Sequence, residues 1–481
     1  MRHALPLRSL TLVAAAVLAG CVNLAPDYQA PTLPVPQTLP SANVEAATPL
    51  DAGWRDFFVE PKLRAVIELA LANNRDLRVA ALNIERARAQ YGIARAGLFP
   101  TIDAGAGGSR SRTPGSLSTG GEPRYATQYS ADLGLTSYEI DLFGRVRNLS
   151  ESALQSFFQT EATQRGTQIS LVASVATAWL QLAADEQRLQ LARHTLESQR
   201  RSFDLIQRGH GLGAQSGLAL AQAQSTVDAA RADAAAFDSQ VEQDRNALAL
   251  LVGATPPAEL LPTPAATDPS TATAATAEPA PAARLLVPPA GLPSSVLQQR
   301  PDVLAAEHAL RASNADIGAA RAAFFPRIAL TASAGTASST LSGLFASGSS
   351  AWSFAPSISV PIFDGGANRA NLRVAEAQQK IQLASYEKTV QTAFREVADA
   401  LAERRTLAER LDAQRSLLDA TSRSFSLSQS LFRSGASSYL DVLDAQRAYY
   451  AAQQTLIGLQ LTEQTNRLTI YKVLGGGWKE S

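Results

Sequence analysis

Hydrophobic residues recur at every seventh position along two very long stretches of the chain. The repeating positions are Val175, Leu182, Leu189, Leu196 and Phe203 in the first stretch, and Val390, Val397, Leu411, Leu418, Phe425 and Phe432, interrupted only by Arg404, in the second. Residues 367–434 contain no Gly and no Pro, and residues 145–208 contain only Gly166. The pattern predicts two helices of roughly 95 to 100 Å that pack as left-handed coiled coils.

Each long stretch ends at a Gly-rich break, over residues 209–213 and 434–437, after which a shorter helical pattern runs back to Val252 or to Leu474. Two long antiparallel helical hairpins are therefore expected, over about 145–252 and about 367–474. The residues that we assign to the two hairpin tips are Gly211, Gly213, Ser216, Gly435 and Ser438.

Two other stretches alternate at a period of two residues. Over residues 352–362, Trp352, Phe354, Ile358, Val360 and Ile362 alternate with small or polar residues, and residues 125–135 show a similar pattern. We predict β-hairpins at about 100–141 and 326–363, each with one apolar face. Such strands suit a barrel with lipid outside and a wet lumen. Since four strands are too few to close a barrel, a membrane-spanning sheet would require oligomerisation.

The chain contains an internal duplication. Residues 92–102 return 226 positions later as residues 318–328 with seven identities, including Phe99-Pro100 and Phe325-Pro326. A second match, at a spacing of 222, relates Gly213, Ala214 and Ser216 to Gly435, Ala436 and Ser438. The repeats predict one body built from two similar halves, a first structural repeat over 61–253 and a second over 294–475.

The remaining segments lack a helical or strand pattern. Residues 21–60 include a Pro-rich tether, residues 254–293 form a Pro/Ala/Thr-rich linker whose default interpretation is disorder, and residues 476–481 are a short tail.

Residues 1–20 have the form of an export signal. Arg2, His3 and Arg8 precede a short apolar stretch that is too short to span a bilayer as a helix. Leu18-Ala19-Gly20-Cys21 then resembles a bacterial lipobox, which predicts cleavage before Cys21 and acylation of its thiol. A plain signal peptide with an incidental cysteine is the alternative. Val22 follows in place of the aspartate that retains such lipoproteins at the inner membrane, so the outer membrane is implied.

Composition excludes several classes of function. Lys and Arg total 43, as do Asp and Glu, so no charge excess indicates a nucleic-acid partner. Cys21 is the only cysteine, which excludes an intrachain disulfide and a multi-cysteine zinc site. The four histidines are scattered, and no phosphate loop or nucleophile elbow is present. We therefore expect no enzyme activity, cofactor or metal site.

Asp441 and Asp444 lie three residues apart, on one helix face, just after the second Gly-rich break. One interpretation is an exposed acidic first turn that the helix dipole favours. The other is a ring of carboxylates, repeated by oligomer symmetry, that narrows a pore and attracts cations. The spacing alone favours the first.

Taken together, the chain resembles the outer-membrane factor family, the TolC/OprM-like exit ducts of tripartite export machines, and in particular its lipidated, NodT-type efflux branch. The motifs that carry the resemblance are the lipobox at Cys21, the two Phe-Pro junctions, and residues 139–145, 360–366 and 435–446.

The resemblance implies an α+β membrane protein, in which a coiled-coil α-barrel of long helical hairpins adjoins four transmembrane strands per chain. A homotrimer would close a twelve-stranded barrel in the outer membrane, and the hairpin tips would meet a periplasmic adaptor protein that joins an inner-membrane pump. Asp441 and Asp444 match the family's pore-constricting aspartates, which shifts the interpretation to a gate. The first-repeat counterparts Ala219 and Gln222 are not acidic, and Ser437 replaces a basic residue that links neighbouring helices in some members.

The function that the resemblance implies is an exit duct for small toxic compounds or drugs, delivered by a pump of the resistance-nodulation-division type. One alternative is the duct of a type I protein secretion system. An alternative of another class is a periplasmic coiled-coil lipoprotein without a channel. A copper-specific duct is not supported, because Met1 is the only methionine.

Overall fold

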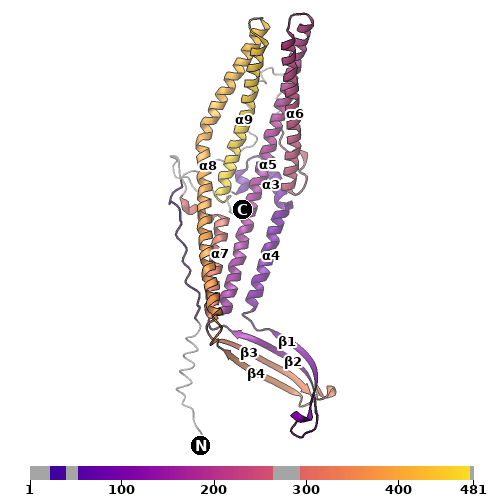
Figure 1. Cartoon of the computed structure of the whole chain (residues 1–481), viewed down its shortest axis with the longest axis vertical. Helices are drawn as coiled ribbons and strands as arrows, with labels where there is room; N and C mark the ends of the chain where they lie inside the picture. Colours follow the sequence, from indigo (N-terminus) through magenta and orange to yellow (C-terminus); the bar gives the residue numbers. More distant parts are fainter. Residues whose placement is uncertain (1–21, 40–52, 264–292, 477–481) are drawn as a thin grey trace. The chain divides into compact units, whose positions relative to one another are not determined.

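The structure is a computed structural model that describes residues 22–39, 53–263 and 293–476 (Figure 1). Cys21 and residues 264–292 of the predicted linker lie outside the described residues. The chain divides into two compact units. The first comprises Met1–Thr32, Asn83–Glu161 and Ala305–Lys388, and the second comprises Leu33–Leu82, Ala162–Leu304 and Thr389–Ser481.

The first unit contains a four-stranded antiparallel sheet (Figure 1). Its strands are β1 (Ile102–Thr113), β2 (Arg124–Ile140), β3 (Arg327–Ser338) and β4 (Ser350–Ser359). They lie in the order β1-β2-β3-β4, so β1 and β4 are edges. Both predicted β-hairpins are confirmed, and the pairing of β2 with β3 joins the two repeats in one sheet.

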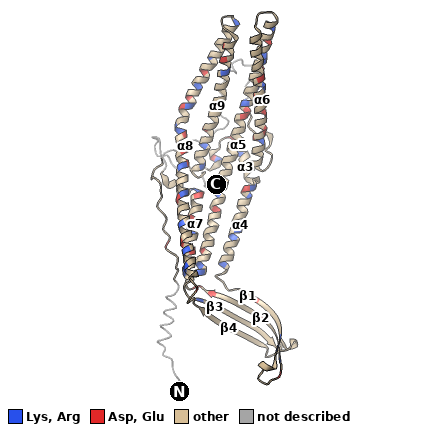
Figure 2. Cartoon of the chain, in the orientation of Figure 1, with Lys and Arg blue, Asp and Glu red and all other residues tan. Residues whose placement is uncertain are grey.

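The strand register gives the sheet one apolar and one polar face. Residues that share the apolar face are Ile102, Leu133, Leu135, Tyr138, Ile140, Ile328, Leu330, Trp352, Phe354 and Ile358. Residues that share the polar face are Asp103, Ser130, Asp132, Glu139, Arg327, Ser333, Ser353 and Ser357. A bulge between Leu135 and Tyr138, where Ser137 has φ 52°, keeps the apolar residues of β2 on one side. Figure 2 shows few charged residues on the strands and many along the helices.

Six helices longer than 20 residues account for most of the described chain. Four of them form the hairpins: α5 (Arg145–Gly211) with α6 (Gly217–Val252), and α8 (Ala367–Arg433) with α9 (Tyr439–Val473). The other two, α4 (Arg75–Ala96) and α7 (Pro301–Ala322), each lead into a strand of the sheet. Shorter helices are α2 (Trp54–Phe57), α3 (Pro61–Asn73) and the 3-10 turns η1 (Gly115–Leu117), η2 (Ala258–Leu260), η4 (Ser294–Gln299) and η5 (Leu341–Gly343).

Side-chain contacts confirm that the hairpins are antiparallel. As the position on α5 falls from Gln199 to Glu186, the partner on α6 rises from Thr226 to Arg245. In the second hairpin Gln414 donates to the carbonyl of Ala452, and Asn466 donates to that of Ala400. The heptad residues turn inward: Val175, Leu182, Val390 and Val397 are at most 1% exposed. This burial is what stabilises helices of such length.

The main hydrophobic core lies in the second unit, where α2, α3, α5, α6 and α9 meet around residues such as Phe57, Leu182, Leu248 and Tyr471. One window of α5 is apolar and long enough to cross a membrane, but 56% of that window is buried in this unit. Its hydrophobicity is therefore explained by helix packing.

Two connections differ from or refine the sequence prediction. Residues 254–263, which we assigned to the linker, pack against the core through Leu260 and Leu261, and the indole of Trp179 donates to the carbonyl of Leu260. A break at Asn74 separates α3 from α4. The side-chain carboxamide of Asn74 donates through Nδ2 to the carbonyl of Leu251, and its Oδ1 accepts from the backbone amide of Leu77.

Candidate site at the helical hairpin tips

The two hairpin tips end their long helices in the same way. Gly213 and Gly435 adopt the left-handed conformation, with φ of 76° and 75°. The following residues, Ala214 and Ala436, donate their amides to the carbonyls of Gly209 and Leu431 at 2.8 and 2.9 Å. This is the Schellman arrangement, which requires a residue without a Cβ penalty at the left-handed position. The sequence match between the tips is therefore a match of backbone geometry.

Gly211 lies at the first hairpin tip as the last residue of α5, one residue before the turn. The helix α5 continues through Gly209 and Gly211, and the turn begins at Leu212. A glycine inside a helix, such as Gly209, lowers stability by about 1 kcal/mol but keeps its amide for the helical hydrogen bond, so it does not end the helix. Only the glycine that must adopt positive φ marks the break.

Ser216 and Ser438 are the N-caps of the returning helices. The hydroxyl of Ser216 accepts from the amide of Ala219 at 3.1 Å. In the second tip Ser438 accepts from the amide of Asp441, and the Asp441 carboxylate accepts in return from the amide and the hydroxyl of Ser438 at 3.0 and 2.9 Å. This reciprocal capping box needs a carboxylate at the third helical position, which Ala219 cannot supply.

Asp441 and Asp444 both lie exposed on α9, as their spacing predicts. Asp441 is engaged by its own N-cap, whereas the Asp444 carboxylate, 65% exposed, lies 3.4 Å from the Arg447 guanidinium. The local structure thus gives Asp441 a capping role, which agrees with the interpretation of the pair as an exposed acidic first turn. Both carboxylates face solvent in the single chain.

The tips are joined by a hydrophobic group that we call the tip cluster. Its buried members are Ile206, Ala219, Ala223, Tyr439, Val442 and Leu443. Phe203, Leu220, Phe425 and Phe432 pack around it. Each hairpin therefore packs against the other close to its tip.

The hairpins share part of this contact, since the equivalent pairs Phe203/Phe425 and Leu220/Val442 all pack in the tip cluster, but they differ in the rest. Ala223 of α6 is fully buried, but its repeat counterpart Ala445 is only half-buried. Conversely, Leu443 of α9 is buried, whereas its counterpart Ala221 is exposed. At these two positions, the residue of one hairpin is thus covered within the chain, and its equivalent in the other hairpin is more exposed.

Two hydroxyl groups beside the tip cluster are buried without a hydrogen-bond partner among the described residues, namely those of Ser437 and Tyr439. Burial raises the pKa of the Tyr439 phenol. Sequence reasoning noted Ser437 only as a departure from the family pattern and did not single out Tyr439. The position of Tyr439 directly after the N-cap Ser438 was the signal in the sequence that could have identified it.

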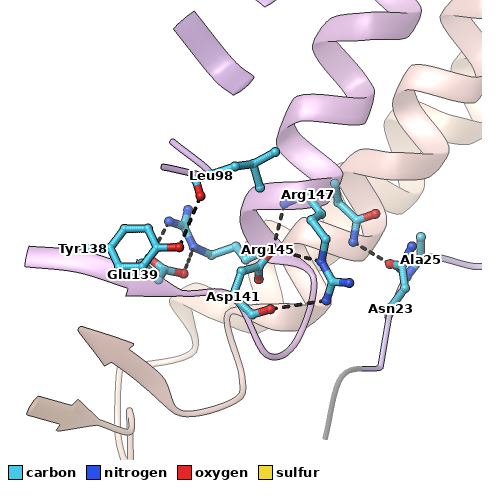
Figure 3. A network of polar contacts seen from close by, with 9 residues as sticks. Asn23, Ala25, Leu98, Tyr138, Glu139, Asp141, Arg145 and Arg147 are labelled. Carbon is cyan, nitrogen blue, oxygen red and sulfur yellow. Dashed lines mark hydrogen bonds and ion pairs between the residues drawn. The ribbon is translucent and has the colours of Figure 1, made fainter. Parts of the chain in front are cut away.

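A polar network connects the sheet to the first long helix (Figure 3). Arg145 donates two hydrogen bonds to Glu139, at 2.8 and 2.7 Å, and Arg327 of β3 lies 2.6 Å from the same carboxylate. Asp141 accepts from the backbone amide of Arg147 at 2.8 Å and caps the start of α5. These contacts explain why residues 139–145 form a recognisable motif: they fix the turn from strand to helix.

The described residues hold no group of three or more His, Cys, Asp or Glu side chains that could bind a metal ion. A cleft of about 420 Å³ in the second unit is lined by Thr177, Gln181, Asp244 and Lys472, among others. Asp244 on its wall has a pKa raised to about 6, chiefly because of burial and also because of the neighbouring Asp185.

Comparison with known proteins decides the family. The family model described as outer membrane efflux protein matches residues 66–254 and 292–476, the two repeats. The chain belongs to the outer membrane efflux protein family. It is an outer-membrane protein that serves as the exit duct of a tripartite efflux system, and the family comprises transporters.

Relatives match nearly end to end. The antibiotic efflux pump outer membrane protein ArpC of Pseudomonas putida is 46% identical over 477 residues, which cover 97% of this chain and 95% of ArpC. The toluene efflux pump outer membrane protein TtgC of Pseudomonas putida shows the same identity and coverage.

Solved structures agree. A membrane protein from Pseudomonas aeruginosa superposes with a TM-score of 0.88 at 42% identity, covering 96% of this chain and 99% of that one. The open state of the MtrE outer membrane channel of Neisseria gonorrhoeae gives a TM-score of 0.84 at 39% identity, covering 95% and 99%.

Proposed function

We propose that three copies of this efflux protein close a twelve-stranded barrel in the outer membrane and, with their helical hairpins, a duct in the periplasm. The observation that carries this proposal is the sheet itself. Its apolar face is exposed at Trp352, Phe354 and Ile358, and among the described residues its two edge strands each lack a second strand partner. Lipid does not tolerate open strand edges, so pairing of β4 with β1 of a neighbouring copy resolves both features.

The tip contact supports the same assembly. Because the two hairpins bury non-equivalent positions in part of this contact, that part is heterologous, and heterologous contacts repeated around an axis generate rings. The uncovered counterparts Ala221 and Ala445 supply the surfaces for the next copy. Three chains then give a ring of six hairpins.

Within that ring, Asp441 and Asp444 of each copy form the narrowest part of the duct. Six carboxylates at close range attract cations and repel anions. The neighbouring tip residues Gly213, Ser216, Gly435 and Ser438, together with Gly211 at the end of α5, are the surface that contacts the periplasmic adaptor. Adaptor binding favours a more open packing of the hairpins, since a ligand shifts a conformational equilibrium toward the state that it binds better.

The cargo is small toxic compounds, delivered through the adaptor from a pump of the resistance-nodulation-division type. The names of the relatives support this class, because they refer to antibiotic and toluene efflux. Acylation at Cys21 adds an anchor in the outer membrane, where a lipid chain contributes about 0.8 kcal/mol per buried methylene.

The test is single-channel conductance of the purified protein in planar bilayers, with the mass of the complex measured in the same sample. We expect a trimer with a cation-preferring conductance, and loss of that preference in Asp441→Asn/Asp444→Asn. Asp412→Asn/Asp419→Asn, which neutralises two exposed carboxylates of α8, is the matched control. If pores of Asp441→Asn/Asp444→Asn kept their cation preference, the proposed carboxylate gate would be contradicted. A wild type that is a monomer without conductance would contradict the proposed duct.

A further inference from the structure

Two arginines lie on the apolar face of the sheet, where charged side chains are not expected. Arg110 and Arg112 of β1 pair with Thr127 and Tyr125 of β2, in the same alternation as Ile102 and Leu133. They therefore share the apolar face. The other charged residues that pair between β1 and β2, namely Asp103, Asp132 and Arg124, fall on the polar face.

The two arginines stand at the end of the sheet remote from the helices. Along β2 the apolar face runs from Ile140, next to α5, to Tyr129, which packs on Gly108 of β1. The eleven residue-to-residue steps between Tyr129 and Ile140, at about 3.3 Å each and tilted as in membrane barrels, span an apolar band of about 25 Å. Tyr129 thus marks the edge of that band that is remote from the helices, and Arg110 and Arg112 lie beyond this edge.

The surroundings of the Arg110 and Arg112 guanidinium groups favour the binding of an anion. Both guanidinium groups lie over the ring of Tyr125, at 5.7 and 6.0 Å from its centre. Within the described residues no carboxylate lies within ion-pair distance of either group, whereas Arg327 on the polar face is paired with Glu139 at 2.6 Å. Stacking on an aromatic ring orients a guanidinium and leaves its donors free for a bidentate acceptor.

We propose that Arg110 and Arg112, held by Tyr125, bind the phosphate groups of lipid headgroups in the outer leaflet of the outer membrane. The proposal rests on the proposed function in one respect, namely that the sheet crosses the membrane with its apolar face toward lipid. Phosphate matches the planar fork of arginine. At the edge of an apolar band, the phosphates that are present continuously are those of the lipid itself.

The test measures lipid binding by the full-length protein. Purified protein in detergent is mixed with lipid A that carries two phosphates, and the bound lipid is counted by native mass spectrometry. The variant is Arg110→Gln/Arg112→Gln. Arg124→Gln is the matched control, because it removes one arginine from the same end of the same hairpin but from the polar face. Dephosphorylated lipid A and inorganic phosphate are the comparison ligands, and trimer mass and conductance are recorded in parallel.

We expect the double variant to bind lipid A roughly ten- to thirtyfold more weakly, given the attraction of two arginines to an anionic surface. The control should stay within about twofold of the wild type. Equal binding by the double variant, equal binding of dephosphorylated lipid A, or displacement of lipid A by an equimolar concentration of inorganic phosphate would each overturn the proposal. If any of these three results were obtained while the protein still formed a conducting trimer, the lipid site would be overturned and the proposed duct would stand. A wild type that retains lipid A through these arginines but forms no pore supports the site and overturns the duct.

Discussion

Two glycines at equivalent positions of the repeats have opposite surroundings. A Cβ at Gly318 would lie 2.4 Å from the Asn148 amide nitrogen and 2.8 Å from Ala25, whereas a Cβ at Gly92 would meet nothing within 4 Å. Gly318 thus makes room for residues 23–26, which the helices bind through Asn148 to Asn23 at 2.8 Å and through Asn314 to Pro26 at 2.7 Å.

Gly318→Ala should therefore release the segment and destabilise the protein by roughly 1 to 3 kcal/mol, as overpacking does. Gly92→Ala should be neutral or stabilising by up to about 1 kcal/mol, since alanine favours the helix. Thermal unfolding gives the first quantity, and amide hydrogen exchange at residues 23–25 reports the release. Equal effects of the two substitutions would show that the segment does not depend on this close approach.

At this scale the sequence predicted residue types better than residue roles. Gly213, Gly435, Ser216 and Ser438 were assigned to the tips from the repeat alone, and they turn and cap the helices there. Composition does not reveal which glycine of this tip takes positive φ, which is Gly213, whereas Gly211 ends α5. The reciprocal cap of Asp441 and the buried hydroxyl of Tyr439 depend on the packing of the two tips, which spacing within one helix cannot show.

At the scale of elements, alternation in β4 makes a prediction about the two faces of the sheet. Phe354, 61% exposed, lies on the apolar face, and the next residue, Ala355, lies on the polar face. Phe354→Lys should place a charge in lipid and lower stability by about 2 to 4 kcal/mol, while Ala355→Lys should be tolerated and should reduce cation conductance.

The measurement is the yield of folded complex in the outer-membrane fraction, followed by conductance of whatever assembles. If Ala355→Lys were the variant that failed to assemble, the polar face would be the one in contact with lipid. Failure of both would point to a sheet covered on both faces.

The pairing of α5 with α6 includes a carboxylate that should make stability depend on pH. Asp244 is 9% exposed, one of its oxygens accepts from Gln240 at 2.9 Å, and the other is buried without a hydrogen-bond partner. Burial, more than the nearby Asp185, raises its pKa to about 6. Arg188 of α5 pairs with Asp185 at 2.7 Å, and Lys472 of α9 lines the same cleft.

Because the folded state binds the proton of Asp244 more tightly than the unfolded state, this contribution to stability is complete below the unfolded pKa near 4. It is lost as pH rises through about 6. The loss amounts to about 2 to 3 kcal/mol. Asp244→Asn should keep a neutral donor and flatten the difference in apparent Tm between pH 5 and pH 8, whereas Asp228→Asn, at a carboxylate that is 45% exposed, should leave it unchanged. A wild type that is more stable at pH 8 would contradict the assignment.

Elements were the most predictable level of this structure. The seven-residue spacing and the absence of Gly and Pro gave the bounds of α5 and α8 to within a few residues, because long helices are fixed by local periodicity. Residues 254–263 were misassigned because small and proline-rich segments can still bury two leucines, here Leu260 and Leu261, against a core formed by distant parts of the chain.

For the whole molecule, the decisive question is how the uncovered hairpin faces are used. Within the chain, Ala223 of α6 is buried in the same cluster as Leu443 of α9. The repeat relates these two positions to Ala445 and Ala221, which remain partly or fully exposed. If the ring closes by repeating the same contact, Ala445 of one copy meets Ala221 of the next.

An Ala221→Cys/Ala445→Cys variant should therefore form disulfides between chains, since Cys21 is the only native cysteine and lies in the N-terminal segment. Non-reducing gels of the oxidised complex should show dimers and covalent trimers, and either single variant should show neither. Cross-linking requires Cα atoms within about 7 Å, so it reports contact and not mere proximity. A complex that keeps the mass of a trimer but yields only monomers on the gel would mean that the hairpins meet their neighbours through other faces. The contact inside one chain would then not be the one that closes the ring.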